Sequence, residues 1–217
     1  MVQNAADNDI LFKGAWYGLL RELVAAIPSA PGDTLILGHA RFVVGKRLQR
    51  QRDRGDVEAG KALDHFGDVL HELVQAEPTD AEIALAASLE SSAQMDGLAL
   101  DSGESLLCSM VLHRQLRKLA TGDKRAIRAL EILSCQREDL RALSGKVVCL
   151  EQLFLRLLAG RSPADIRAAV CGRPHVDKAL TACFGCSANG IAVEDWAVGL
   201  KSYVNSLRAD ASTVLET

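Results

Sequence analysis

The segment GLALDSGESLLCSMVLHRQLRKLATGDKRAIRALEIL, from Gly97 to Leu133, places acidic residues at the starts of two predicted helices. A short apolar, strand-like run (LAL) precedes Asp101 and Glu104 in this segment. The run Leu116–Thr121 predicts a strand, and Asp123 follows it after one glycine. Strands that end near an acidic residue and lead into a helix indicate an α/β fold whose functional residues lie at one edge of the sheet.

The rest of the chain continues this alternation of strands and helices. A short, weakly strand-like start leads to the acidic cluster Asp7–Asp9. Thr34–Leu37 and Val147–Leu150 are β-prone runs, and Val57–Val74 has the apolar spacing of a helix. Thr79 and Glu82 have the pattern of a capping box, which predicts a further helix from about Asp80 to Gln94. We therefore expect an α/β fold, specifically a Rossmann-like α/β/α sandwich with a mostly parallel sheet.

The first helix is predicted over Trp16–Ile27, where apolar residues recur at the spacing of one helical face. Pro28 ends this pattern, because proline disfavours continuation of a helix. The run Pro28–Asp33 is rich in proline and glycine and predicts a turn.

The last part of the chain has a different character and predicts helices only. Ser162, followed by a proline, has the pattern of a helix N-cap, and Trp196–Leu207 has the apolar spacing of a final helix. We expect an α/β domain over residues 1–160 and a helical extension over residues 161–217 that packs on it. We expect the chain to fray from about Asp210.

The composition is that of an ordinary soluble protein. The chain has 217 residues, 48% of them hydrophobic, and a formal charge of −3, which excludes a protein that coats nucleic acid through overall positive charge. There is no apolar run of membrane-spanning length and no signal-peptide pattern, so we expect a cytoplasmic protein that does not enter a membrane. Of its cysteines, Cys108, Cys135 and Cys149 lie in apolar patterns and are expected to be buried, and all thiols are expected to be reduced.

The acidic clusters predict a metal site. The carboxyl ends of parallel strands share one edge, so Asp7, Asp101, Glu104 and Asp123 are expected to converge there, with Asp9 as a further choice. Converging carboxylates repel one another unless a cation neutralises them, and oxygen-only ligands suit Mg²⁺ or Mn²⁺. The alternative is that these residues only cap helices, because aspartate and glutamate are also favoured at helix starts.

A basic stretch supplies candidate phosphate contacts. Six basic residues lie between Arg41 and Arg54, with Asp53 as the only acid. Arg47 and Arg50 from this stretch, together with Lys124 and Arg125 beside Asp123, are our candidates for contact with a substrate phosphate. The alternative for the basic stretch is a solvated helix face.

Three segments, DNDILFK, LDSGES and LATGDKRAIRAL, resemble the acidic motifs of PIN-like domains over roughly residues 1–160. The resemblance implies a Rossmann-like fold, a metal-dependent ribonuclease activity and RNA as the substrate. It matches Asp7 to the first-strand aspartate, Asp101 or Glu104 to the acid at a helix start, and Asp123 to the aspartate of the late motif. These residues would bind one or two Mg²⁺ or Mn²⁺ ions.

The sequence departs from that family at one acidic position. PIN nucleases usually carry a glutamate early in the helix after the second strand, where this chain has LGHARFVVGKR, and Glu82 and Glu90 are the candidates to replace it. The missing acid favours a second interpretation, a catalytically impaired PIN-like interaction module. Its apolar helical tail would then contact a protein partner or form a homodimer.

The sequence contains two other patterns that suit a chemical site. Asp7 and Asp9 form the D-x-D of haloacid-dehalogenase-like phosphohydrolases, in which the first aspartate is a nucleophile and the second a general acid. Separately, a zinc site is the alternative to buried cysteines in the tail, because thiolates and imidazole suit Zn²⁺. Its ligands would be Cys171, His175, Cys183 and Cys186.

Overall fold

The computed structural model describes residues 4–28, 33–188 and 192–217. Its described residues form a five-stranded sheet in the order β3-β2-β1-β4-β5, and every neighbouring pair is parallel. The strands are β1 (Asn4–Ala6), β2 (Thr34–Leu37), β3 (Val74–Ala76), β4 (Lys118–Thr121) and β5 (Val147–Cys149). The order reverses beside β1, which is the position where ligands gather in open parallel sheets.

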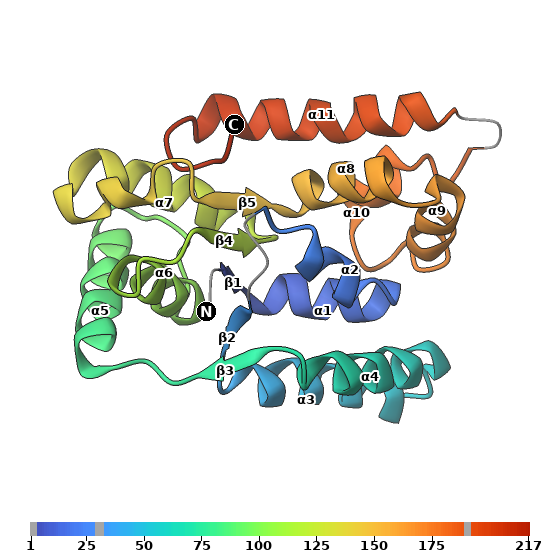
Figure 1. Ribbon diagram of the computed structural model, residues 1–217, viewed down its shortest axis with the longest axis horizontal. Coiled ribbons are helices and arrows are strands. Elements are labelled where there is room, and N and C mark those ends of the chain that lie inside the picture. Colours follow the sequence, from blue (N-terminus) through green and yellow to red (C-terminus); the bar gives the residue numbers. More distant parts are fainter. Residues whose placement is uncertain (1–3, 29–32, 189–191) are drawn as a thin grey trace.

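Helices cover both faces of the sheet (Figure 1). One face is covered by α1 (Asn8–Tyr17), α2 (Leu20–Ala25), α3 (Ala40–Asp53), α4 (Val57–Leu70) and α8 (Leu150–Gly160). The other face is covered by α5 (Asp80–Met95), α6 (Ser102–His113) and α7 (Lys124–Gln136), with the 3₁₀ helix Glu138–Leu143 beside them. The expected α/β/α arrangement with a parallel sheet is therefore confirmed.

Successive side chains of each strand point to opposite faces of the sheet, and both faces carry apolar side chains that the helices cover. In β2, Leu35 and Leu37 belong to the apolar core under α5–α7, whereas Ile36 belongs to the core under α1–α4 and α8. All three side chains are buried, since successive strand residues point to opposite faces and both faces are covered. Ala5 and Ala6 of β1 divide between the two cores in the same way.

The predicted strands Thr34–Leu37, Leu116–Thr121 and Val147–Leu150 correspond to β2, β4 and β5. The expected helix Val57–Val74 is confirmed over Val57–Leu70, and β3, a short strand at the sheet edge that begins at Val74, was not predicted. One prediction in this region is wrong. The apolar run before Asp101 forms no strand, and Leu98 instead donates its N–H to the carbonyl of Ala93 at the end of α5.

The prediction of one helix over Trp16–Ile27 is also wrong. α1 starts earlier and ends at Gly18, whose φ of +64° is left-handed and favours glycine. α2 then begins at Leu20, packed so closely that a Cβ on Gly14 would lie 2.9 Å from the Leu20 Cα. The apolar spacing runs on across the break because both helices bury residues in the same core. The predicted turn at Pro28–Asp33 lies largely outside the described residues.

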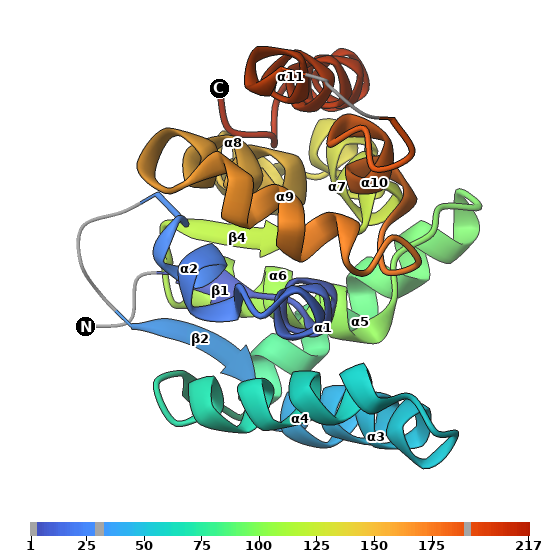
Figure 2. The same ribbon diagram turned by 90° about the vertical axis from the view of Figure 1, so that its right-hand side faces the viewer.

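The C-terminal part contains α9 (Pro163–Cys171), α10 (Lys178–Cys183) and α11 (Val193–Asp210), and α11 lies across the end of the molecule next to α8 (Figure 2). The predicted start of α9 is confirmed, since Ser162 Oγ accepts the backbone N–H of Asp165. α11 buries Leu200 in one core and Val204 in the other, so the helical extension contributes to both.

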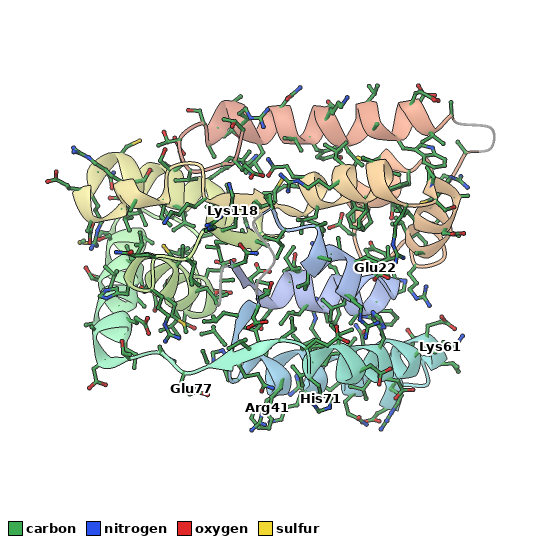
Figure 3. All side chains as sticks on the ribbon, viewed as in Figure 1. Glu22, Arg41, Lys61, His71, Glu77 and Lys118 are labelled. Carbon is green, nitrogen blue, oxygen red and sulfur yellow. A yellow bond between two sulfur atoms is a disulfide. The ribbon has the colours of Figure 1, made fainter. Side chains whose placement is uncertain are left out.

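The expectation that the chain frays from Asp210 is wrong. Val214 and Leu215 are buried, and Leu215 forms an isolated parallel bridge with Val147 of β5. The carboxylate of Glu131 accepts the backbone N–H groups of Thr213 and Val214 at 2.9–3.1 Å. Lys118, labelled on β4 in Figure 3, pairs with Glu216 at 2.7 Å. The tail therefore completes the edge of the sheet beyond β5.

No helix in the described ranges has both the length and the apolar character needed to cross a bilayer.

Candidate functional site

A cavity of about 470 Å³ opens where β1 and β4 end and α1, α6 and α7 begin. It is lined by charged side chains from segments that are far apart in the sequence. These are Asp7, Asp9, Lys13, Arg47, Asp101, Glu104, Asp123 and Arg125. The four carboxylates predicted as metal ligands thus lie around one cavity.

Asp7 joins the first strand to the first helix. As the N-cap of α1, its Oδ1 accepts the backbone N–H of Ile10 at 2.8 Å, and its Oδ2 accepts the hydroxyl of Thr121, the last residue of β4. Only 5% of Asp7 is exposed, and this burial, together with the nearby Asp9 carboxylate, raises the pKa of Asp7 to about 7. The Asp7 carboxyl group therefore keeps its proton to a higher pH than an exposed aspartate does.

Asp101 and Glu104 form a reciprocal capping box at the start of α6. Asp101 Oδ1 accepts the Glu104 N–H at 2.9 Å, and Glu104 Oε2 accepts the Asp101 N–H at 3.0 Å. Burial, together with the charges of Asp101, Asp123 and Asp7, raises the pKa of Glu104 to about 8, and the hydrogen bond from the Asp101 N–H acts in the opposite direction. Glu104 thus senses the other three carboxylates, and the four form one electrostatic cluster.

Asp123 caps α7 and is neutralised by a neighbour. Its Oδ1 accepts the N–H of Arg125 at 2.7 Å, and its Oδ2 lies 2.7 Å from the Arg125 guanidinium. Burial alone would raise the pKa of Asp123, but the hydrogen bonds and charge of Arg125 bring that pKa below its ordinary value. Both oxygens of Asp123 are therefore engaged by Arg125.

Asp9 is tied to a lysine rather than to the other acids. Lys13 Nζ lies 2.6 Å from Asp9 Oδ2 and 2.7 Å from Asp177 Oδ2, at the start of α10. Gly122 leaves the space for this carboxylate, since a Cβ there would lie 2.1 Å from Asp9 Oδ2. This pairing brings the C-terminal helices to the edge of the cavity.

The four candidate phosphate contacts are placed differently. Arg47 and Arg125 line the cavity, whereas Arg50 lies further along α3 and outside the lining. Arg47 stacks its guanidinium 3.6 Å from the centre of the Phe12 ring. Lys124 Nζ lies 2.5 Å from the buried Glu151 and over the ring of Tyr203, also outside the cavity lining.

The donor chemistry around the cavity suits a hard divalent cation, since every candidate ligand atom is a carboxylate oxygen. In the described part of the chain, Glu104 Oε1 and Asp101 Oδ2 accept no hydrogen bond. However, within residues 4–28, 33–188 and 192–217 no group of three or more such side chains is already arranged to hold a metal ion. The set therefore fits Mg²⁺ or Mn²⁺ in chemistry but is not pre-assembled around one.

The cysteine-rich tail contains a disulfide between Cys171 and Cys186. The expectation that all thiols are reduced is therefore wrong for this pair. A disulfide and a zinc site at Cys171, His175, Cys183 and Cys186 exclude each other, because Zn²⁺ binds thiolates. His175 packs edge-on against Trp16 at 5.2 Å between ring centres. The expected burial of Cys108 and Cys149 is confirmed, but Cys135 is exposed because it lies on the outer side of α7.

Several residues that shape the cavity were not among the sequence candidates. Thr121 and Gly122 lie inside the quoted TGD motif, where the loop before a capped helix could have signalled them. Lys13 stands four residues after Asp9, the spacing of a helical ion pair, whereas Asp177 has no local signal. Glu82, a candidate to replace the missing acid, instead pairs with Arg114 at 2.7 Å, outside the cavity lining; Glu90 also lies outside it.

Comparisons with protein-family models, curated proteins and solved structures gave no match to this chain.

Proposed function

We propose that this chain is a PIN-like, divalent-metal-dependent endoribonuclease whose Asp7, Asp101, Glu104 and Asp123 bind Mg²⁺ or Mn²⁺. One observation carries the proposal. Carboxylates from the ends of β1 and β4 and from the start of α6 line a single cavity, and the repulsion among them contributes to a Glu104 pKa of about 8. A divalent cation bound among these carboxylates would displace their protons and neutralise their mutual repulsion.

A bound cation would lower the pKa of a water molecule and stabilise negative charge on a phosphodiester oxygen. The chain's own residues prepare the site for it. Thr121 and the Ile10 N–H fix the Asp7 carboxylate, and the capping box fixes one oxygen each of Asp101 and Glu104 while leaving the other free. Arg125 neutralises Asp123, so cation binding would release its guanidinium toward a phosphate.

RNA as substrate rests on the resemblance of the three acidic motifs to PIN-like domains. The sheet order and the position of the acids at the carboxyl ends of the central strands are compatible with that resemblance. The positive charges of Arg47 and Arg125 at the same cavity suit a phosphodiester, which brings negative charge to an acidic site.

Cleavage of a labelled single-stranded RNA with Mn²⁺, with Mg²⁺ and with EDTA tests the proposal. We expect cleavage by the wild-type chain with either metal, none with EDTA, and a large loss in Asp7→Asn and Glu104→Gln. Glu104→Gln keeps the size of the side chain and can still accept the Asp101 N–H, so a loss in this variant reports on charge rather than on the helix cap. Cleavage that persists in both variants would contradict the proposed metal site.

A non-catalytic interaction module is the second candidate. It is favoured by the Arg125–Asp123 pair and by the lack of a pre-assembled metal group in the described residues. Neither RNA cleavage nor calorimetric Mn²⁺ binding would be expected of such a module, and a protein partner or a second copy of the chain would be its ligand.

The haloacid-dehalogenase-like phosphohydrolase is tested by a different substrate. Turnover of a small phosphomonoester that Asp7→Asn abolishes would favour that function.

A further inference from the structure

We propose that the exposed side of α3 is the surface along which single-stranded RNA reaches the acidic cavity. Arg47, Arg50 and Arg54 would contact successive phosphates, and Phe42 would stack on a base. This inference rests on the proposed function for the identity of the ligand. It adds the path of the strand and the residues that hold it outside the cavity.

The first argument is continuity with the cavity. Val43 and Arg47 of α3 both line it. Arg50 lies three residues after Arg47, and Arg54 lies seven residues after it. From Val43 the spacings are seven and eleven residues. All of these spacings return to the same side of a helix. The row from Arg47 to Arg54 covers about 10 Å along the axis at 1.5 Å per residue. One row of guanidinium groups thus leads outward from the cavity.

The second argument is that these arginines are exposed and have no carboxylate partner. Arg47, Arg50 and Arg54 are all exposed, and none forms an ion pair in the described part of the chain. The nearby Asp53 is engaged by Gln49 at 2.7 Å and by Arg52 at 3.4 Å. An unpaired row of positive charge beside an acidic cavity offsets the repulsion that the cavity exerts on a polyanion.

The guanidinium group of Arg47 is oriented by stacking and can still bind an external anion. Although it lines a cavity rich in carboxylates, its guanidinium stacks on the ring of Phe12, a side chain that is only 4% exposed. Stacking fixes the guanidinium plane and leaves the N–H groups at its edge available to a phosphate. The packing against Phe12 therefore reduces the conformational entropy lost when the phosphate binds.

An exposed aromatic ring at the start of the same helix, on the side next to the row, favours a single strand. Phe42 is 52% exposed, and the guanidinium of Arg41 lies 4.4 Å from its ring centre. Figure 3 shows Arg41 on the outer side of α3. Unpaired bases stack on such rings, whereas bases inside a duplex are not available for stacking.

Fluorescence anisotropy with a labelled oligouridylate in EDTA tests the inference without cleavage. We expect Arg50→Ala/Arg54→Ala to weaken binding about tenfold or more, and to reduce the slope of log K against log salt by about 0.7 per arginine. Phe42→Ala should weaken binding about fivefold or more with the slope unchanged. Arg52→Ala is the matched control, since Arg52 lies on the opposite side of the same helix and should leave both quantities nearly unchanged.

An unchanged affinity and slope in the double variant would overturn the inference, as would an equal loss in Arg52→Ala. The proposed function is tested separately, by cleavage with metal. Binding that depends on α3 without any cleavage would retain this surface and reject the nuclease. Cleavage with normal rate and affinity in Arg50→Ala/Arg54→Ala would retain the nuclease and reject this surface.

Discussion

Lys13 Nζ lies 2.7 Å from Asp177 Oδ2, so a single ammonium group joins the first helix to the C-terminal helices. The same atom lies 2.6 Å from Asp9 at the edge of the cavity. Burial lowers the pKa of Lys13, but the two carboxylates outweigh this effect and leave its pKa above the ordinary value. Lys13 thus remains charged, and the cavity edge depends on a residue about 165 positions away in the sequence.

Replacing Lys13 tests this connection. Lys13→Met leaves two partly buried carboxylates without their nearest counter-charge, and we expect the free energy of unfolding in urea to fall by about 3 kcal/mol. Lys61→Met is the control, since Lys61 forms an exposed pair with Glu58 at 2.6 Å and should cause no measurable change. Equal stability of the two variants would contradict a structural role for the Lys13 pairs.

The acidic cluster predicts how the stability of the metal-free chain depends on pH. The pKa values of Asp7 and Glu104 are raised to about 7 and about 8, so the folded state binds protons that the unfolded state releases. Their contribution is fully present below about pH 4 and is lost as the pH rises through 7 and 8. Through Asp7 alone, the wild-type chain should lose on the order of 4 kcal/mol of unfolding free energy between pH 4 and pH 8. Asp7→Asn cannot titrate at this position, so the variant should not show this part of the loss.

Urea unfolding in EDTA at several pH values measures this effect. Asp56→Asn is the control, because Asp56 caps α4 through the N–H groups of Glu58 and Ala59 but lies outside the cavity lining. A wild-type stability that rises between pH 5 and pH 8, or a profile that Asp7→Asn leaves unchanged, would show that the carboxylates are not buried together.

The disulfide gives a prediction that also decides the zinc question. In denaturant without reductant we expect thiol titration to count the four free cysteines, Cys108, Cys135, Cys149 and Cys183, with Cys171 and Cys186 added only after reduction. The bridge spans a sequence separation of 15, so reduction should cost about 3 kcal/mol of stability. A count of all cysteines before reduction, together with zinc in the purified protein, would instead favour the metal site.

Much of the fold could be predicted because its signals are local. Short β-prone apolar runs marked β2, β4 and β5, and the capping pattern at Ser162 marked α9. The errors arose where a local pattern agreed with more than one structure. The spacing through Trp16–Ile27 fits one helix or two that share a core, and a left-handed Gly18 decides between them only in three dimensions.

The acids of the candidate site could be proposed from sequence because each stands at the start of a helix. The residues that pair with these acids could not be predicted, because a contact between segments far apart in the sequence produces no local sequence pattern. Arg125 neutralising Asp123 is local, yet the sequence did not indicate whether that arginine would face a phosphate or its neighbouring carboxylate. Asp177 reaches Lys13 only through the packing of α10.

The most direct measurement compares two helix caps of the same design. Asp123 and Asp56 each cap a helix through the second and third residues that follow, but only Asp123 lines the cavity. Asparagine can replace either cap, so both variants should fold. With Mn²⁺ and single-stranded RNA, we expect Asp123→Asn to cleave about 100-fold more slowly than wild type or worse, and Asp56→Asn to cleave at the wild-type rate. Equal cleavage by both variants, or cleavage that EDTA does not abolish, would contradict a metal-dependent nuclease site at this cavity.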